Sequence, residues 1–325
     1  MKQLAEILEL GGDIWQVDLE ERGEPGATAA YFIKGEAGWM LVETGPATSA
    51  ERILEAAVSL GIAHHQVCHM AVTHIHLDHA GGLGTLARYF KAAKIWVHAK
   101  GHKHMADPTR LVEGSRAALG DQKMEEYGDV LPVPAKRLFP ANEGTRIHLG
   151  GNRILEIWET PGHARHHVCF YDAHTRGLFS GDAAGIYFPR LSKMLNRPVL
   201  RPATPAPDFN GSLMRQTLCR LALNELDNIY FAHFGAASPA KYLIELAIGQ
   251  LAVQMHMAEL YMTEPDGLQK LRLALRKRLE MELGITAGEE IMNKTAVRYE
   301  LEFLLGPLQA AASGLLEDLK RAPRP

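Results

Sequence analysis

Short runs of alternating hydrophobic and polar positions predict β-strands in the first part of the chain. Three of them, separated by turns rich in Gly and Glu, lie at residues 14–17, 30–33 and 39–42. A nearly continuous apolar run at 67–72 predicts a strand that is buried on both faces. Between these runs, apolar residues recur at helical spacing, so that a helix capped by Thr48 or Ser49 is expected to reach Leu60.

The pattern continues with a helix at 83–90 and a strand at 95–98, and it weakens from 100 to 134. We expect this weaker segment to form helical pieces inserted over one edge of the sheet, as part of the wall of an active site. Further strands are predicted at 146–149, 154–158, 168–171, 178–180 and 229–232.

From Ser238 onward the pattern changes to helices alone. The chain is therefore predicted to contain a domain at 1–237 and a helical extension at 238–325. The apolar faces of the extension must be covered by one another, by the main domain or by a second subunit, so the extension is expected to act as a lid, a homodimer interface or both. Four helices are marked by Ile244, Ala247, Ile248, Leu251 and Met255, by Leu268, Leu271, Leu275 and Leu279, by Met292, Ala296, Tyr299 and Phe303, and by Leu308, Ala312, Leu315, Leu316 and Leu319.

Candidate metal ligands stand directly after the buried strand. His74, His76, Asp78 and His79 fall within six positions, ahead of two glycines. Imidazole nitrogen and carboxylate oxygen suit zinc, manganese or iron, and the lack of a cysteine here argues against a closed structural zinc finger. Because the four side chains can aim at two neighbouring points, two adjacent metals are expected.

The same arrangement recurs along the chain. An apolar strand ends and a potential ligand follows at His163, at Asp182 and at His233. Loops at the ends of rigid strands usually carry chemistry. This recurrence predicts that the strand ends converge on one metal site.

Bulk properties exclude several classes of partner. The formal net charge is −3 and no long Lys/Arg block is present, so nucleic acid is not expected as the main partner. Glu6 and Glu9 interrupt the region where a secretory signal would need apolar residues, and no apolar run reaches membrane-spanning length. We expect a cytoplasmic protein without a membrane partner, in which Cys68, Cys169 and Cys219 are reduced, buried thiols.

Four motifs, Thr73–Gly82, Thr160–His163, Gly181–Asp182 and His233, resemble those of the metallo-β-lactamase-fold superfamily, in its glyoxalase II-like branch. The resemblance covers about residues 14 to 240. It implies an α/β protein with a four-layer αββα sandwich, to which the helical appendage is added. It also implies a ligand set of His74, His76 and His163 for a first metal, Asp78, His79 and His233 for a second, and Asp182 bridging the two.

Departures from the family's motifs reduce the number of activities that are expected. Glu43 stands where the family often has Asp, which predicts rearranged hydrogen bonds around the ligands. Asp182 occupies the place of the Cys of Cys-type β-lactamases, and His76 the place of a Glu in flavin-linked relatives. Lactone hydrolases carry a Tyr where this chain has Gly185, and Tyr187 is out of register with it. These differences argue against β-lactamase and flavin-linked activity and weaken a lactonase assignment.

Two divalent cations about 3.5–4 Å apart can share a hydroxide that attacks an ester-like bond at neutral pH. Zinc is expected first, with iron or manganese as alternatives, and the family resemblance implies that Asp78 steers the proton of this hydroxide. The predicted function is a metal-dependent hydrolase of a small molecule, with thioesters ranked before lactones and phosphodiesters because a thiolate leaves without a general acid. A mononuclear-iron oxidoreductase similar to persulfide dioxygenases, and a metal-binding signalling protein with little turnover, remain open.

Other residues are assigned supporting roles. His167 is expected to orient a ligand imidazole. The segment from Ile186 to Asp208 is predicted to be an extended path stiffened by prolines. It is interpreted either as an ordinary surface connection or as a substrate-binding wall, and in the second case Tyr187, Arg190 and Arg201 are candidates for binding an anionic substrate.

Overall fold

The computed structural model describes residues 5–284 and 295–321, which form two compact units. Unit 1 comprises the chain up to Glu159 together with His166–Gly181 and Leu226–Ala237. Unit 2 comprises Thr160–Arg165, Asp182–Glu225 and the described residues from Ser238 onward. The domain boundary predicted between residues 237 and 238 stays a prediction.

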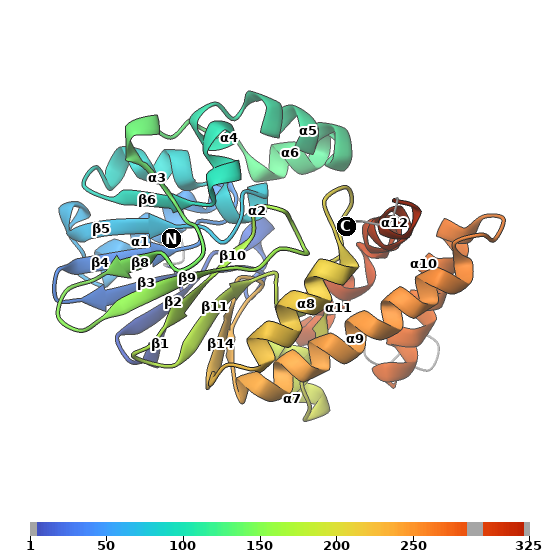
Figure 1. The fold of residues 1–325 in the computed structure, drawn as a ribbon. Coiled ribbons are helices and arrows are strands. Elements are labelled where there is room, and N and C mark those ends of the chain that lie inside the picture. Colours follow the sequence, from blue (N-terminus) through green and yellow to red (C-terminus); the bar gives the residue numbers. More distant parts are fainter. Residues whose placement is uncertain (1–4, 285–294, 322–325) are drawn as a thin grey trace. The chain divides into compact units, whose positions relative to one another are not determined.

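Unit 1 is built on two β-sheets (Figure 1). The first has seven strands in chain order, antiparallel up to the fourth strand and parallel from there on. They are β1 (Ile7–Gly11), β2 (Ile14–Asp18), β3 (Ala29–Gly35), β4 (Gly38–Val42), β5 (Val67–Ala71), β6 (Lys94–Val97) and β7 (Leu138–Pro140).

The second sheet has six strands. They are β8 (Arg146–His148), β9 (Ile154–Glu159), β10 (Val168–Asp172), β11 (Gly177–Gly181), β14 (Asn228–Phe231) and β15 (Ala236–Ala237). Their order is β15-β14-β11-β10-β9-β8, and β11 and β14 pair in parallel. Because of this pairing, the ends of β11 and β14 lie at the same edge of the sheet. Asp182 follows β11 directly, and His233 comes two positions after the end of β14.

Side chains on successive positions of a strand point to opposite faces, and in unit 1 both faces of the first sheet are buried. Tyr31 and Met40 belong to a core shared with Phe170 and Phe179 of the second sheet. Phe32, one position after Tyr31, belongs to a separate core that includes residues of several helices. The central strands therefore have hydrophobic residues on both faces, because each face of the sheet packs against its own covering layer.

The helices of unit 1 lie between its strands in the chain. Helices α1 and α3 supply Ile53, Ala56, Leu83 and Leu86 to the core on the outer face of the first sheet (Figure 1). The bounds are α1 (Ala50–Ser59), α2 (Leu77–Ala80), α3 (Leu83–Tyr89), α4 (His102–Ala106), α5 (Thr109–Leu119) and α6 (Asp121–Tyr127), with short 3-10 helices at Glu21–Gly23, Ala47–Ser49, His64–Gln66, Ala99–Gly101 and Ala135–Arg137.

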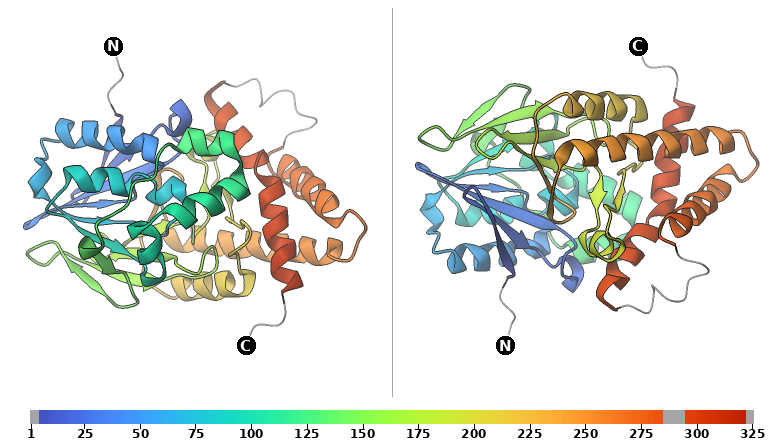
Figure 2. Two further views of the ribbon diagram at one scale, coloured as in Figure 1. Left: turned by 90° about the horizontal axis from the view of Figure 1, so that it is seen from above. Right: turned by 90° about the horizontal axis from the view of Figure 1, so that it is seen from below.

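Unit 2 is mainly helical. Helices α9 and α10, drawn in orange, lie side by side, and α12 packs against both (Figure 2). Its elements are β12 (Ile186–Tyr187), α7 (Pro189–Leu195), β13 (Leu200–Arg201), α8 (Gly211–Ala222), α9 (Ala240–Tyr261), α10 (Gly267–Glu282), α11 (Thr295–Leu305) and α12 (Leu308–Lys320). None of the helices in the described parts of the chain combines the length and the apolar character that a bilayer crossing requires.

The four helices predicted after Ser238 are present. The predicted apolar stripes of the first, second and fourth are buried at Leu251, Leu271 and Leu315, whereas Tyr299 and Phe303 of the third are only half-buried. Met292 and the side chain of Ala296 lie outside the described residues. Leu260, Leu273 and Met281 remain 59%, 52% and 73% exposed within unit 2. The predicted homodimer would cover such surface and stays a prediction.

Two expectations were wrong. The segment after Asp182 was predicted to be extended, but Pro189 opens helix α7, because the fixed φ of proline suits the first helical position. The three cysteines are free, but only Cys169 is buried; Cys68 is partly exposed and Cys219 is exposed on α8.

Candidate metal centre

The His/Asp motif of unit 1 occupies the turn between β5 and helix α3. The side chains of His74 and His79 are 0% and 1% exposed. Gly81 makes this tight turn feasible, because a Cβ atom there would lie 2.4 Å from the carbonyl oxygen of Leu77. Leu77 also packs in a small core with Met124 and Tyr127 of α6, so the weakly patterned segment 100–134 does buttress the motif.

The first two histidines of the motif face each other. His74 Nε2 lies 2.9 Å from His76 Nδ1, and His74 Nδ1 lies 3.1 Å from the hydroxyl oxygen of Thr73. Two imidazole nitrogens at this distance share either one proton or one cation. Because the hydroxyl of Thr73 can engage Nδ1 of His74, Nε2 is the atom that this ring offers to a metal.

Three more donors converge within unit 1. Asp78 Oδ2 lies 3.9 Å from His79 Nε2 and 3.7 Å from His233 Nε2, and one ligand atom from each of the three residues lies within 4.8 Å of the others. His233 is 4% exposed and lies two positions after the end of β14. Residues 78 and 233 are far apart in sequence, and the fold of unit 1 brings them together.

Glu43 connects the two parts of the motif. It has a left-handed backbone (φ 67°) at the end of β4 and is 2% exposed. Its Oε1 accepts a hydrogen bond from the backbone N–H of Thr73 at 3.2 Å, and its Oε2 lies 3.4 Å from His79 Nδ1. From the sequence, Glu43 was recognised only as a departure from the family. The structure shows that its side chain, longer than that of Asp, reaches both Thr73 and His79.

Two histidines next to the Thr160–His163 turn also pack on the motif. The ring of His167, 1% exposed, stacks on His74 with centroids 5.0 Å apart. The ring centroid of His166 lies 6.2 Å from that of His74 and 5.7 Å from that of His76, and its Nδ1 accepts from the backbone N–H of Ile75 at 3.5 Å. Sequence reasoning left the place of His166 open, since a loop position carries no periodicity.

Unit 2 contains the two remaining predicted ligands. His163 Nε2 lies 3.4 Å from Asp182 Oδ2, and both side chains are buried. The Nδ1–H of His163 can donate to the carbonyl oxygen of Ala203 at 3.1 Å. This hydrogen bond fixes the tautomer in which Nε2 keeps a lone pair, as a metal-binding imidazole requires. Unit 2 thus brings His163 and Asp182 together, 19 positions apart in the numbering.

The predicted substrate-binding residues have different surroundings. Arg201 is 4% exposed, and its Nη1 donates to the carbonyl oxygen of Leu304 at 2.8 Å. Burial lowers the pKa of Arg201 to about 10, and the negative charge of Asp182 opposes this shift. Tyr187 pairs with Leu200 in a two-stranded ribbon, and the backbone N–H of Arg190 donates to Glu300.

The residue types fit divalent metal ions. All seven predicted ligands are imidazoles or carboxylates. Five of them are at most 5% exposed, and His76 and Asp78 are half-buried. Within each unit their ring nitrogens and carboxylate oxygens lie close to one another. Such donors suit zinc, iron or manganese. Two facing sheets with His/Asp groups at their strand ends therefore define an α/β protein with a candidate metal centre.

The chain belongs to the metallo-beta-lactamase superfamily, whose sequence model matches residues 23–233. Members of this superfamily are generally hydrolytic metalloenzymes. The resemblance inferred from the four motifs is thereby confirmed, and so is the fold class, the αββα sandwich of this superfamily with a helical C-terminal region.

Several relatives are similar to the chain. It is 30% identical over 194 residues to the metallo-beta-lactamase fold-containing protein ST1585 of Sulfurisphaera tokodaii, which covers 58% of this chain and 69% of that protein. The solved structure of ST1585 has a TM-score of 0.62 at 21% identity, over 98% of this chain and 100% of the other, which shows the shared fold.

Two relatives have enzyme names. A hydroxyacylglutathione hydrolase of Aeromonas hydrophila is 24% identical over 278 residues, which cover 85% of this chain and 89% of that protein. The acyl-coenzyme A thioesterase MBLAC2 of Gallus gallus is 31% identical over 123 residues, but this match covers only 34% of this chain and 39% of that protein. Both names describe enzymes that act on thioesters.

Proposed function

We propose that the protein is a metal-dependent hydrolase that cleaves a small thioester with the help of two divalent cations, zinc being the first choice. The observation that carries the proposal is the convergence of Asp78, His79 and His233, whose ligand atoms lie within 4.8 Å of one another. In this proposal His74 and His76 contribute to the same centre. The order of the family's motifs supports the addition of His163 and Asp182 from unit 2.

When bound, the two cations would acidify a water molecule and polarise the carbonyl group of the substrate. The protein's own residues would orient and exchange protons. Asp78 Oδ2, within 4 Å of two imidazole nitrogens, is placed to hold the proton that the attacking water gives up. Glu43 Oε2 lies 3.4 Å from Nδ1 of His79, and Nε2 of the same ring faces Asp78, so Glu43 is placed to orient the ring.

A thioester is the preferred substrate for a chemical reason. A thiol has a pKa of about 8.5, so it leaves as a thiolate without a proton donor. The names of the two relatives that act on thioesters support the same choice. Lactones and phosphodiesters rank below it, and the substrate is proposed to be a small molecule rather than nucleic acid.

The proposal can be tested by measuring bound metals and hydrolysis together. Metal content is determined by elemental mass spectrometry, and turnover by thiol release from hydroxyacyl-glutathione and acyl-coenzyme A, with a lactone and a phosphodiester for comparison. We expect two divalent cations per chain, and thioester hydrolysis that falls at least 100-fold, on the order expected for loss of a ligand, in His233→Ala. His65→Ala, at an exposed position of unit 1, is the matched control.

Two results would contradict this proposal. One iron per chain with oxygen uptake and no thiol release would indicate an oxidoreductase. Bound metal without turnover of any of the four substrates would indicate a binding protein.

A further inference from the structure

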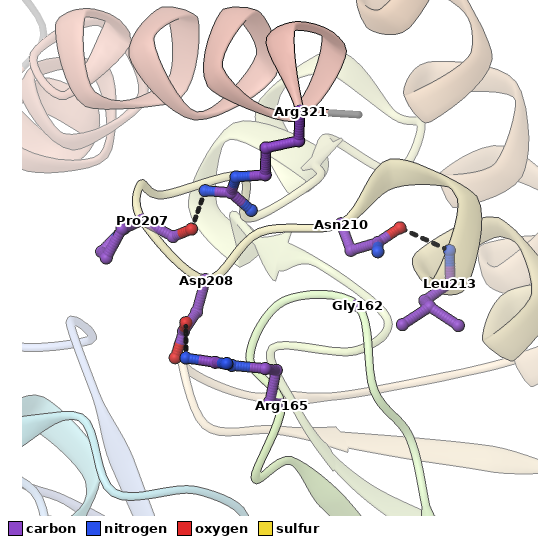
Figure 3. Close-up of a pocket in the computed structure, with 7 residues that line it drawn as sticks. All are labelled: Gly162, Arg165, Pro207, Asp208, Asn210, Leu213 and Arg321. Carbon is purple, nitrogen blue, oxygen red and sulfur yellow. Dashed lines mark hydrogen bonds and ion pairs between the residues drawn. The ribbon is translucent and has the colours of Figure 1, made fainter. Parts of the chain in front are cut away.

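Unit 2 contains a cavity of about 480 Å³ that none of the predicted site residues lines (Figure 3). Its volume is in the range of small-molecule sites, about 300–1,000 Å³. Three segments meet around it: the turn that carries His163, the loop that leads into α8, and the end of α12. The lining residues are Gly162, Arg165, Pro207, Asp208, Asn210, Leu213 and Arg321.

Hydrogen bonds hold the walls of the cavity in place. The backbone N–H of Asn210 donates to the carbonyl oxygen of Gly162 at 2.7 Å. Gly162 has φ 143°, and a Cβ atom there would lie 2.4 Å from Cα of Met214, so the turn packs directly on α8. The guanidinium of Arg321 donates to the carbonyl oxygen of Pro207 (Figure 3). It also donates to the carbonyl oxygen of Phe209. A ligand would thus meet a site that is already formed.

The cavity offers an apolar surface and hydrogen-bond donors. Leu213 and Pro207 supply the apolar part. Asn210 is 5% exposed, and because its Oδ1 accepts from the backbone N–H of Leu213 at 3.0 Å, the group that it has to offer a ligand is the amide N–H of Nδ2. Arg165 adds a guanidinium whose side chain is 74% exposed. Such surroundings complement an apolar chain that ends in a hydrogen-bond acceptor.

Asp208 is the one carboxylate in the lining. Its Oδ1 lies 2.8 Å from Nη2 of Arg165, and this ion pair holds the guanidinium at the cavity (Figure 3). Arg321 donates to two carbonyl oxygens and lies 3.7 Å from Glu317. An incoming anion would therefore compete with Asp208 for Arg165.

The cavity adjoins one of the proposed metal ligands. Gly162 precedes His163 in the chain, so one turn provides both a wall of the cavity and an imidazole of the centre. Arg201, a candidate from the sequence, is buried against the carbonyl oxygen of Leu304, which leaves the exposed Arg165 as the better cation for a ligand.

We propose that this cavity binds an organic anion, namely the part of the substrate that carries a carboxylate or phosphate but does not react, and that Arg165 recognises its charge. The assignment of this anion to the substrate rests on the proposed hydrolase function. The binding itself does not, because it needs neither bound metal nor turnover.

The test measures binding of three unreactive probes with one common chain: octanoate, octyl phosphate and octanol. By titration calorimetry, we expect one or both anions to bind at least tenfold more tightly than octanol. Arg165→Ala should weaken anion binding about tenfold without changing octanol binding. Arg215→Ala removes an exposed arginine of α8 that does not line the cavity, and it should change nothing. Comparison of the two anions separates a carboxylate from a phosphate ligand.

The direction in which Asp208→Asn changes the affinity for the two anions is the decisive result. Because the substitution removes the internal competitor of the ligand, anion binding should become several-fold tighter. Tighter binding of octanol than of both anions, an unchanged affinity in Arg165→Ala, or weaker anion binding in Asp208→Asn would each overturn the proposal. Anion binding that depends on Arg165 in a protein without hydrolytic activity would instead contradict the proposed function alone.

Discussion

Glu43→Gln is expected to weaken metal binding while leaving the fold intact. The substituted amide can still offer its oxygen to the backbone N–H of Thr73, but its –NH₂ then faces His79 Nδ1, where the carboxylate oxygen now lies at 3.4 Å. An N–H donor at that point turns Nδ1 into an acceptor and moves the ring proton to Nε2. This is the nitrogen that faces Asp78, and a protonated nitrogen cannot ligate a metal.

The expected loss of metal affinity can be taken from other residues that orient metal ligands in proteins. Their loss reduces metal affinity about 10–100-fold, or about 1.4–2.7 kcal/mol. The assay is a competition titration of zinc against a chromophoric chelator, combined with urea denaturation of the metal-free protein. We expect the unfolding free energy of the metal-free protein to change by less than about 1 kcal/mol, since the hydrogen bond to Thr73 is kept.

Glu24→Gln is the matched control, because it makes the same chemical change at an exposed position of unit 1. An affinity for zinc in Glu43→Gln equal to that of this control would refute the assignment of Glu43 as the residue that orients His79. An equal loss of metal-free stability and of affinity would show instead that Glu43 serves only the fold.

Three further predictions concern stability and can be checked by urea denaturation. Arg137→Ala should lower the unfolding free energy by about 2–4 kcal/mol, because the guanidinium of Arg137 donates to three backbone carbonyls within and just after α3. The control Lys136→Ala changes the exposed neighbouring residue and should cost less than about 0.5 kcal/mol. Glu300→Ala should cost about 2–5 kcal/mol, because it leaves two backbone N–H groups of α7 without their acceptor; a cost below about 1 kcal/mol would contradict this. Burial, assisted by a neighbouring lysine, lowers the pKa of His69 to about 4. Between about pH 6.5 and 4 the unfolded chain therefore binds a proton at residue 69 that the folded protein does not bind. The free energy of unfolding should decrease as the pH is lowered through this range, and His69→Gln should make this decrease smaller.

The elements of unit 1 with a strong pattern were predictable from the sequence. The strands around Phe32, Leu41 and Met70 were placed correctly because each has apolar residues on both faces, a signal that burial imposes directly. The candidate ligands were predictable for a different reason. Asp or His directly after an apolar strand is rare enough to be recognised, and within unit 1 Asp78 and His233 do lie together.

Other features leave little trace in the sequence. Helix α7 was missed because its seven residues are too few for a periodic signal, and because its first backbone N–H groups are satisfied by Glu300, more than a hundred positions away. The role of Glu43 depends on the length of one side chain and on a left-handed backbone conformation. The cavity at Arg165 is formed by three separate segments, and no local pattern predicts such a meeting.

The hydroxyl of Tyr31, near the start of the chain, donates to the carbonyl oxygen of Phe231 at 2.6 Å, and the strand that contains Phe231 pairs with β11. A ribosome must therefore synthesise the chain as far as residue 231 before this contact between the two sheets can form. Until the strands of the second sheet have been synthesised, the face of the first sheet that includes Tyr31 has no covering layer. Production of this protein should consequently depend on chaperones that shield apolar surface during synthesis.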